Sequence, residues 1–128
     1  MSVSLTPTIS IVDDDDSVRL AVSSLVRSLG FKVSTFASAE EFLTSDVMED
    51  TSCLVSDIQM PGMSGLDLQK VLIQRQCRIP IIFITAFPED AVRRRAEAAG
   101  AIGFLSKPFD GQAMIECLTA ALERPPHA

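Results

Sequence analysis

The sequence has few of the residues that bind zinc or build a disulfide framework. Its 128 residues include three cysteines, Cys53, Cys77 and Cys117, and one histidine, His127. The cysteines are odd in number, widely spaced and without a Cys-x-x-Cys pair, which argues against both kinds of site. Each cysteine lies among apolar neighbours, so we expect small, buried, free thiols in a reducing compartment.

Long apolar runs and an excess of basic residues are also absent. No segment approaches the ~20 apolar residues that cross a bilayer, and residues 1–7 lack the basic and apolar regions of a secretory signal. We therefore expect a soluble, cytoplasmic protein without a membrane partner. The 17 acidic and 11 basic side chains give a net charge of -6, which repels phosphate backbones and disfavours direct binding of nucleic acid.

The length and composition are those of one globular domain. A chain of 128 residues with 47% hydrophobic and 22% charged residues can bury a single core. Five short apolar runs alternate with amphipathic stretches, the pattern of β-α units that form a parallel sheet with helices on both faces. The second unit is short, and its strand is expected at a sheet edge. The strands are expected at residues 8–12, 31–35, 53–56, 79–84 and 101–106.

Local signals mark where the expected helices begin. Ser38-x-x-Glu41 and Ser64-x-x-Asp67 have the form of capping boxes. Pro88-Glu89-Asp90 places proline and acidic residues in a first helical turn, where both are favoured. Asp110 is the expected cap of the last helix.

Polar residues follow the expected strands at their carboxyl ends. They are Asp13, Asp14, Asp57, Thr85 and Lys107. Because the carboxyl ends of parallel strands meet at one edge of an open sheet, we expect these side chains in one crevice. Three carboxylates there repel one another unless a cation joins them, and their hard oxygens suit Mg²⁺ or Mn²⁺. The ammonium group and the hydroxyl complete the surroundings of a phosphoryl group on a carboxylate, for which Asp57 is the natural acceptor.

Four sequence motifs contain or flank these polar residues. They are Ile11-Val12-Asp13-Asp14-Asp15, Val55-Ser56-Asp57-Ile58-Gln59-Met60-Pro61-Gly62-Met63-Ser64-Gly65, Ile84-Thr85-Ala86 and Gly103-Phe104-Leu105-Ser106-Lys107-Pro108-Phe109. In this order they resemble the receiver domain of two-component response regulators, and their wording is most similar to the FixJ type. The resemblance covers Thr8 to Leu122, and we expect a receiver domain over residues 1–124, with 125–128 beginning a linker or tail. It implies an α/β fold of five β-α units, in which a doubly wound parallel sheet has the flavodoxin-like strand order 2-1-3-4-5.

By this resemblance, Asp57 takes a phosphoryl group from a cognate histidine kinase. Asp14 and Asp57 bind Mg²⁺ directly, with Mn²⁺ as a possible substitute, Gln59 adds its backbone carbonyl, and Asp13 acts through water. The domain is then a signalling phosphoacceptor rather than an enzyme, although it assists its own phosphoryl transfer and hydrolysis. Gln59 and Phe87, each two residues beyond a site residue, are expected at the crevice mouth, where we predict that they influence the lifetime of the acyl phosphate.

The resemblance also implies a switch. Lys107 neutralises the phosphoryl group and is turned inward by a cis bond to Pro108, while Thr85 and Phe104 move together on phosphorylation. This movement reshapes the face made by the fourth helix, the fifth strand and the fifth helix, through which two copies pair. A DNA-binding output domain, absent from this chain, would be controlled in this way. Without the resemblance, Phe104 is interpreted as a core residue.

Three alternatives remain from the residues themselves. Asp14-x-Asp16-x-Val18 resembles the Asp-x-Asp motif of haloacid-dehalogenase-type phosphatases, in which Asp14 is the nucleophile and Asp57 has no role. A pseudo-receiver, acting as an interaction module, has the same fold without the chemistry. A flavin carrier shares the topology, but an acidic crevice without glycine-rich amides is a poor phosphate cradle.

Two charge runs are interpreted as solvated structure. Asp15 and Asp16 are expected to form a turn and a helix cap rather than to bind metal. Arg93-Arg94-Arg95 is expected to be the solvated face of the fourth helix rather than a binding patch.

Overall fold

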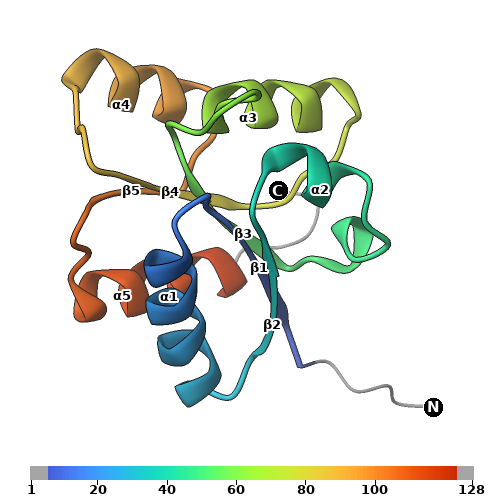
Figure 1. Ribbon diagram of the computed structural model, residues 1–128, viewed down its shortest axis with the longest axis vertical. Coiled ribbons are helices and arrows are strands. Elements are labelled where there is room, and N and C mark those ends of the chain that lie inside the picture. The colour runs from blue at the N-terminus through green and yellow to red at the C-terminus, as the bar shows by residue number, and fades with distance from the viewer. Residues whose placement is uncertain (1–5, 124–128) are drawn as a thin grey trace.

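The computed structural model describes residues 6–123, along which strands and helices alternate (Figure 1). The expected linker at 125–128 lies outside the described residues. Within the described range, no helix is long and apolar enough to span a bilayer. The strands are β1 (Thr8–Val12), β2 (Lys32–Phe36), β3 (Cys53–Asp57), β4 (Ile81–Thr85) and β5 (Gly103–Ser106). The helices are α1 (Asp16–Ser28), α2 (Ala39–Leu43), α3 (Gly65–Gln74), α4 (Asp90–Ala98) and α5 (Gly111–Glu123), with a short 3-10 helix η1 (Met48–Asp50).

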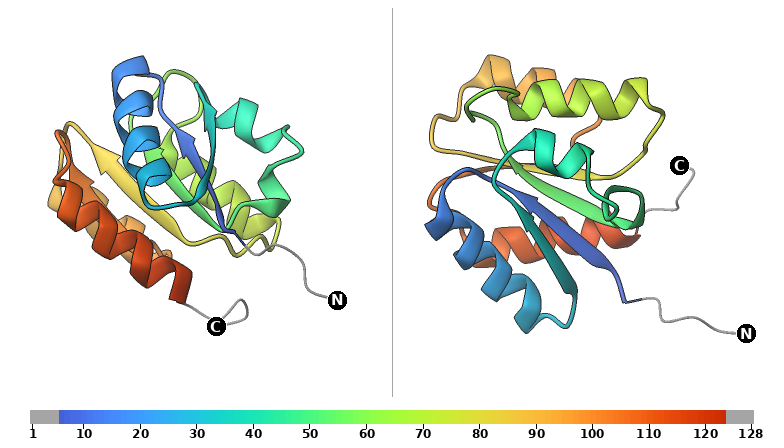
Figure 2. Two further views of the ribbon diagram at one scale, coloured as in Figure 1. Left: turned by 90° about the horizontal axis from the view of Figure 1, so that it is seen from below. Right: turned by 45° about the vertical axis from the view of Figure 1, so that its right-hand side comes forward.

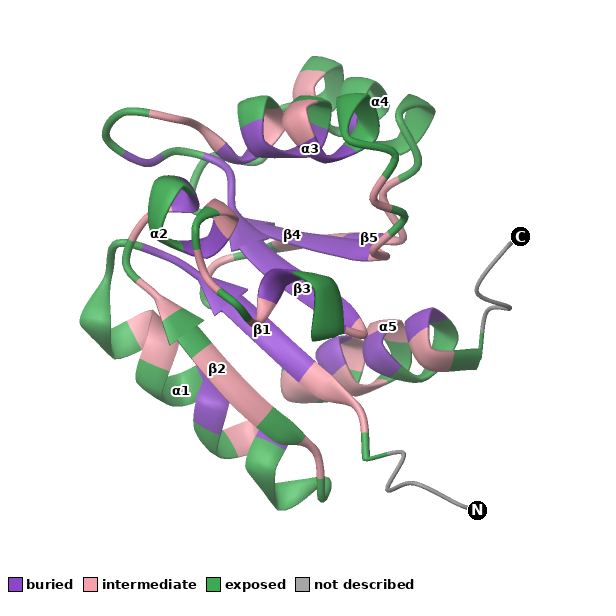
Figure 3. Cartoon of the chain, turned by 90° about the vertical axis from the view of Figure 1, so that its right-hand side faces the viewer, coloured by how far each residue is buried: buried purple, intermediate pink, exposed green. Residues whose placement is uncertain are grey.

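All five strands are parallel and lie in the order β2-β1-β3-β4-β5. β3 and β4 are buried along their whole length, and β1 is buried from Ile9 onward (Figure 3). β2 is the half-exposed edge strand that its alternating polarity predicts. The predicted fold class is therefore confirmed as a doubly wound α/β domain with the flavodoxin-like strand order.

The helices cover both faces of the sheet, so the sheet separates two cores (Figures 1 and 2). On one face, side chains of α2, α3 and α4 pack on Leu54 and Phe83, and Phe104 packs against this core. On the other face, side chains of α1 and α5 pack on Ile11, Val55 and further strand residues. The alternation of side chains along each strand sends neighbouring apolar residues to opposite cores, which explains why the central strands are mostly apolar.

Some strand boundaries differ from the prediction. β2 begins one residue later than predicted, and β4 and β5 begin two residues later, at Ile81 and Gly103. Before β4, Pro80 has no N–H for a strand ladder, although its carbonyl accepts the Leu54 N–H at 2.9 Å. Before β5, the Ala101 N–H is used to close α4, because it donates to the Ala96 carbonyl at 3.0 Å.

The predicted caps are only partly confirmed. Ser64 and Asp67 form a complete capping box, whereas at α2 the Ser38 side chain accepts the Glu41 N–H but the Glu41 carboxylate accepts the N–H of Ala37 instead of that of Ser38. The acidic side chain reaches one residue past its predicted partner.

The predicted starts of α4 and α5 have different outcomes. Pro88 lies before the cap of α4, which is Glu89, so the prediction that it belongs to the first turn is wrong. The predicted cap of α5 is confirmed, since Asp110 accepts the Ala113 N–H at 3.1 Å.

Of the cysteines, all of which are free, Cys53 is buried and the other two are half-buried, so the expectation of burial holds fully for one of them.

Candidate functional site

The predicted polar residues lie at the carboxyl edge of the sheet. Asp13 directly follows β1, Asp57 ends β3 and Thr85 ends β4, and these three strands are neighbours in the sheet. Lys107 follows β5, and its N–H donates to the Thr85 carbonyl at 2.8 Å. The parallel topology therefore brings together residues that are far apart in the sequence.

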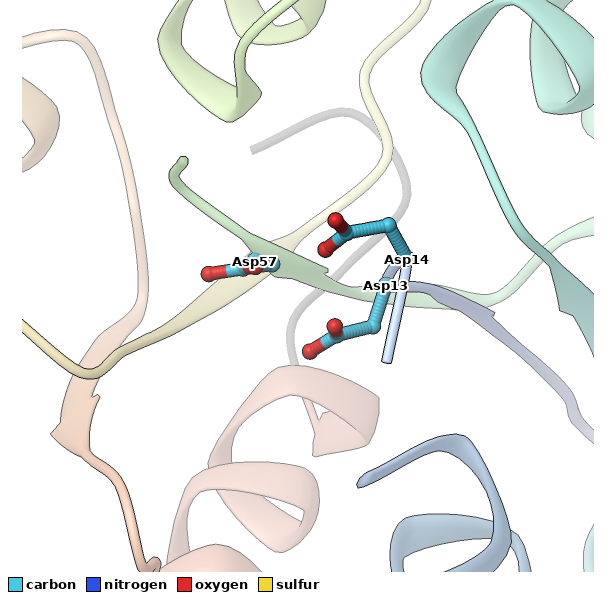
Figure 4. Close-up of side chains that lie close together, drawn as sticks. All are labelled: Asp13, Asp14 and Asp57. Atoms are coloured by element: carbon cyan, nitrogen blue, oxygen red, sulfur yellow. The ribbon is translucent and has the colours of Figure 1, made fainter. Parts of the chain in front are cut away.

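Three carboxylates form the centre of the site. One oxygen from each of Asp13, Asp14 and Asp57 lies within 4.8 Å of the others. Figure 4 shows their side chains extending to the same side from the ends of β1 and β3. Asp13 is 0% exposed and Asp57 4% exposed, whereas Asp14 is exposed. Two of the carboxylates are thus removed from water and the third is open to solvent.

Lys107 is the counter-ion of the two buried carboxylates. Its Nζ lies 2.9 Å from Asp13 Oδ2 and 3.3 Å from Asp57 Oδ2. The peptide bond between Lys107 and Pro108 is cis, as the resemblance implied. One ammonium group therefore faces two carboxylates, which leaves the buried part of the site with an excess of negative charge.

This excess is visible in the acid–base properties of the site. Burial is the main cause that raises the pKa of Asp57 above the ordinary value, and the charge of Asp13 raises it further, against the opposing effects of Lys107 and the Gln59 N–H. Burial by itself lowers the pKa of Lys107, but the two carboxylates outweigh it and hold this pKa above the ordinary value. A further positive charge in the site would stabilise the ionised Asp57 carboxylate and lower its pKa.

The residues fit a hard divalent cation. Asp13 Oδ2 is fully buried and, apart from the ion pair with Lys107, has no hydrogen bond within the described residues. Carboxylate and carbonyl oxygens are the ligands that such ions prefer. The donors that lie together are the carboxylates of Asp13, Asp14 and Asp57. The resemblance adds the backbone carbonyl of Gln59, a residue that follows Asp57 by two positions and is exposed.

Thr85 and Phe104 lie in different environments. Thr85 is 1% exposed, and its hydroxyl oxygen accepts the N–H of Phe87 at 3.0 Å. Phe104 pairs with Phe83 across β4 and β5 and is half-buried against the core of α2, α3 and α4. The structure therefore gives Phe104 the core position that its residue type indicates. The Phe87 ring is 61% exposed.

The loop after β1 has contacts that sequence reasoning did not identify. Asp13 Oδ1 accepts the N–H of Asp15, and Asp15 caps α1 as expected. Asp16 pairs with Arg19, whose guanidinium group also donates to the Asp13 carbonyl. The only sequence signal for Arg19 is its place one helical turn after the acidic run. This arginine ties the loop that contains Asp13 and Asp14 to α1.

Close packing holds the loop after β3. The Gly65 N–H donates to the Ile58 carbonyl at 2.7 Å, and a Cβ on Gly65 would lie 2.2 Å from the Asp57 carbonyl oxygen. Any larger residue would therefore force the start of α3 away from the end of β3. In the same loop, the Met63 N–H donates to Glu40 of α2, a residue that sequence reasoning did not select.

The triple-arginine run is solvated, as predicted. Arg93, Arg94 and Arg95 are all exposed on α4. Arg93 pairs with Asp90 one turn earlier, at 2.8 Å, and both side chains are at least half exposed. Exposed pairs of this kind contribute little to stability, typically ~0–1 kcal/mol.

Comparison with known proteins identifies the family to which this fold belongs. Residues 9–119 match the family model of the response regulator receiver domain. The chain belongs to this family. Receiver domains are signalling domains of two-component systems, and this receiver contains all the carboxylate, hydroxyl and ammonium residues that its sequence motifs predicted.

Individual relatives agree with this assignment. The receiver is 46% identical to Nodulation protein W of Bradyrhizobium diazoefficiens over 89% of this chain and 50% of that protein. It matches the structure of the response regulator StyR with a TM-score of 0.85 and 47% identity, covering 92% of this chain and 60% of that one. It matches FixJ-N with a TM-score of 0.83 and 35% identity, covering 95% and 98%. The chain spans about half the length of the curated relatives that it matches.

Proposed function

We propose that this receiver is a phosphoacceptor of a two-component system and that Asp57 is the residue phosphorylated. The observation that supports this most directly is the placement of a buried Asp57 carboxylate within 4.8 Å of two other carboxylates, with the Lys107 ammonium group 3.3 Å away. Such a site favours the arrival of positive charge and can surround a transferred phosphoryl group on two sides.

Mg²⁺ is the proposed cofactor, with Mn²⁺ as a substitute. Asp14 and Asp57 would bind it directly, Gln59 through its backbone carbonyl and Asp13 through water. When bound, the ion supplies positive charge that neutralises the carboxylates and the phosphoryl oxygens. The raised pKa of Asp57 and the excess of three clustered carboxylates over the one Lys107 ammonium group support a cation site here.

The proposed partner is a phosphohistidine on a cognate histidine kinase. A carboxylate oxygen of Asp57 forms a bond to phosphorus while the phosphorus–nitrogen bond breaks, and the electron pair of that bond returns to the imidazole. Lys107 keeps its proton throughout, because its pKa is raised. Its ammonium group is then available to the phosphoryl oxygens, within ion-pair distance of the acceptor.

Thr85 is the proposed link to the response. Its hydroxyl oxygen already accepts the Phe87 N–H, so its hydrogen is available to donate to a phosphoryl oxygen.

A movement of Thr85, together with Phe104 on the neighbouring strand, would reshape the face formed by α4, β5 and α5. We propose that this face pairs two copies and controls a DNA-binding output domain outside this chain. About 2.8 kcal/mol of differential stabilisation changes the ratio of two conformations a hundredfold, within the range of a few charge-assisted hydrogen bonds.

The phosphatase alternative is less well supported by the site. It requires Asp14 as the nucleophile, but Asp14 is exposed and has no ion pair among the described residues. Asp57, for which that mechanism has no role, is the buried carboxylate paired with Lys107. The same pairing favours a chemically active receiver over a pseudo-receiver.

Incubation with acetyl phosphate and Mg²⁺ tests the proposal. We expect an adduct of ~80 Da that peptide mass analysis locates on Asp57. It should be lost in EDTA and in Asp57→Asn, while Asp46→Asn, a change at an exposed aspartate outside the site, should leave it intact. An adduct on Asp14, or none on Asp57, would refute the assignment.

A further inference from the structure

A contact between α2 and the loop after β3 has no role in the chemistry described so far. Glu40, in the first turn of α2, extends its carboxylate to this loop, where Oε2 accepts the Met63 N–H at 3.1 Å. The two residues are 23 positions apart in the sequence. The contact therefore ties the helix beside the edge strand to the segment that follows Asp57.

The shape of the loop is adapted to this contact. Gly62 follows Pro61 and has a φ of 77°. A proline followed by a residue with positive φ is typical of a tight turn. A Cβ on Gly62 would lie 2.9 Å from Glu40 Oε2, so the carboxylate packs directly on the bare α carbon of the turn. A side chain at this position would push the carboxylate away.

Glu40 provides the hydrogen bond that joins the far end of this loop to α2. Ile58 is fixed at one end, because its N–H donates to the Ile84 carbonyl and its own carbonyl accepts the Gly65 N–H. From residue 59 to residue 63, two backbone N–H groups reach side chains of other elements in the described structure. That of Gln59 bonds to the Asp57 carboxylate at the end of β3, and that of Met63 bonds to Glu40 of α2. The position of the Gln59 carbonyl thus depends on an anchor at each end of a short segment.

We propose that Glu40 is a positioning residue for the metal site. By holding Met63, it sets the place of the Gln59 carbonyl, and this inference rests on the proposed function, in which that carbonyl binds Mg²⁺. Glu40 is not one of the three clustered carboxylates, so it acts through the loop and not as a ligand. Groups that orient metal ligands in this way commonly have a measurable effect on affinity.

The test is metal binding by the unphosphorylated domain, with Mn²⁺ followed by electron paramagnetic resonance and Mg²⁺ by calorimetry. Glu40→Ala should weaken both affinities about three- to tenfold, the range expected for the loss of one hydrogen bond that orients a ligand. Glu40→Gln keeps an oxygen acceptor and should bind close to wild type. Glu41→Ala removes the same charge from the same helix, but its carboxylate bonds to Ala37, so binding should not change.

A second measurement checks the contact itself. Amide hydrogen exchange at Met63 should be faster in Glu40→Ala than in wild type, and unchanged in Glu41→Ala. If Met63 exchange does not change, the anchoring contact is absent in solution and the inference fails.

The outcomes separate this inference from the proposed function. If the wild-type domain does not bind either ion, the proposed metal site itself is wrong. If wild type binds and Glu40→Ala binds equally well, the positioning role is refuted, even where the melting temperature of the variant falls. Equal weakening in Glu41→Ala, or a failure of Glu40→Gln to restore binding, would show an effect of charge alone and would also refute it.

Discussion

The Lys107 ammonium group lies nearer to Asp13, at 2.9 Å, than to Asp57, at 3.3 Å. This lysine is therefore the counter-ion of a pair of buried carboxylates and not the partner of Asp57 alone. Any cation that enters the site competes with it for the same negative charge. The stability of the fold and the affinity for metal are consequently linked through Lys107.

Substitution of Lys107 by methionine is the direct test of this link. In EDTA, Lys107→Met should lower the free energy of unfolding by about 1–3 kcal/mol, because the buried carboxylates lose their counter-ion. Mg²⁺ should restore more stability in the variant than it adds to wild type. Urea denaturation with Mg²⁺ and with EDTA measures both effects, and Lys70→Met, at an exposed lysine of α3, is the control. Equal effects of Mg²⁺ on variant and wild type would contradict the competition.

Asp57→Asn should stabilise the fold at neutral pH in EDTA. The pKa of Asp57 is raised in the folded state, mainly by burial, so the ionised carboxylate destabilises the fold, and wild-type stability falls as the pH rises through that pKa. We expect a gain of about 1 kcal/mol at pH 7, as is common for a relieved site residue. The gain should disappear below the ordinary aspartate value of 3.8.

Asp67→Asn provides a control of opposite sign for this pH dependence. The Ser64 backbone N–H, with the Ser64 hydroxyl, lowers the pKa of Asp67 in the capping box of α3. Ionised Asp67 therefore contributes stability that is present above the ordinary pKa and is lost as the pH falls through the folded value. The variant should be less stable than wild type at neutral pH and equal to it in acid. A pH-independent difference for either variant, measured by urea denaturation between pH 3 and pH 8, would show that titration is not the cause.

The sequence predicted the sheet and the central site because both follow from local patterns. Apolar runs fully buried between two layers of helices are distinctive, and the parallel topology then places the residue after each strand at one edge. Asp13, Asp57, Thr85 and Lys107 were found in this way. Element ends were predicted less well, since the Ala101 N–H closes α4 rather than beginning β5.

Contacts between distant side chains and backbone were not predicted. Glu40 and Glu41 are adjacent acidic residues with the same local sequence signal, yet one bonds to Ala37 and the other crosses to Met63. Only the three-dimensional path of the loop after β3 decides between them. Gln69 is a similar case, because a polar residue on the inner side of α3 has no sequence signal that names its partner.

The Gln69 side chain contacts the end of α4, and this contact gives a prediction. Its side chain is 4% exposed and donates from Nε2 to the Ala96 carbonyl at 3.1 Å. Because this carbonyl also accepts the Ala101 N–H, Gln69→Ala does not orphan it, and the free energy of unfolding should fall by only about 1–2 kcal/mol. Hydrogen exchange should become faster at the end of α4. Gln74→Ala, at an exposed position, should change neither quantity.

Thr85 variants test the proposed response. Thr85→Ala should still be phosphorylated on Asp57, but phosphorylation-dependent pairing of two copies should weaken about 10- to 100-fold, the loss expected for one hydrogen bond to a charged group. Thr85→Ser keeps the hydroxyl and should retain most of the pairing. Light scattering with and without acetyl phosphate measures it. Pairing by Thr85→Ala equal to that of wild type would exclude the hydroxyl from the response.

The lifetime of the phosphorylated state should depend on Gln59 and Phe87, two exposed residues that the sequence predicts at the mouth of the site. Removal of the 61% exposed ring in Phe87→Ala, or of the side chain in Gln59→Ala, changes the access of water to the acyl phosphate. We expect faster decay when the ring is removed. Decay can be followed by the loss of the Asp57 adduct after acetyl phosphate is withdrawn. Identical decay in both variants and wild type would disprove a shielding role.

The exposure of Phe87 has a practical consequence. The chain has no tryptophan and no tyrosine, so an indole placed at this position would be its only strong fluorophore. The backbone N–H of Phe87 donates to the Thr85 hydroxyl oxygen. A change in the partner of that hydroxyl would therefore change the environment of residue 87. Phe87→Trp would therefore give the domain a single strong fluorophore, whose emission we expect to change when the partner of the Thr85 hydroxyl changes.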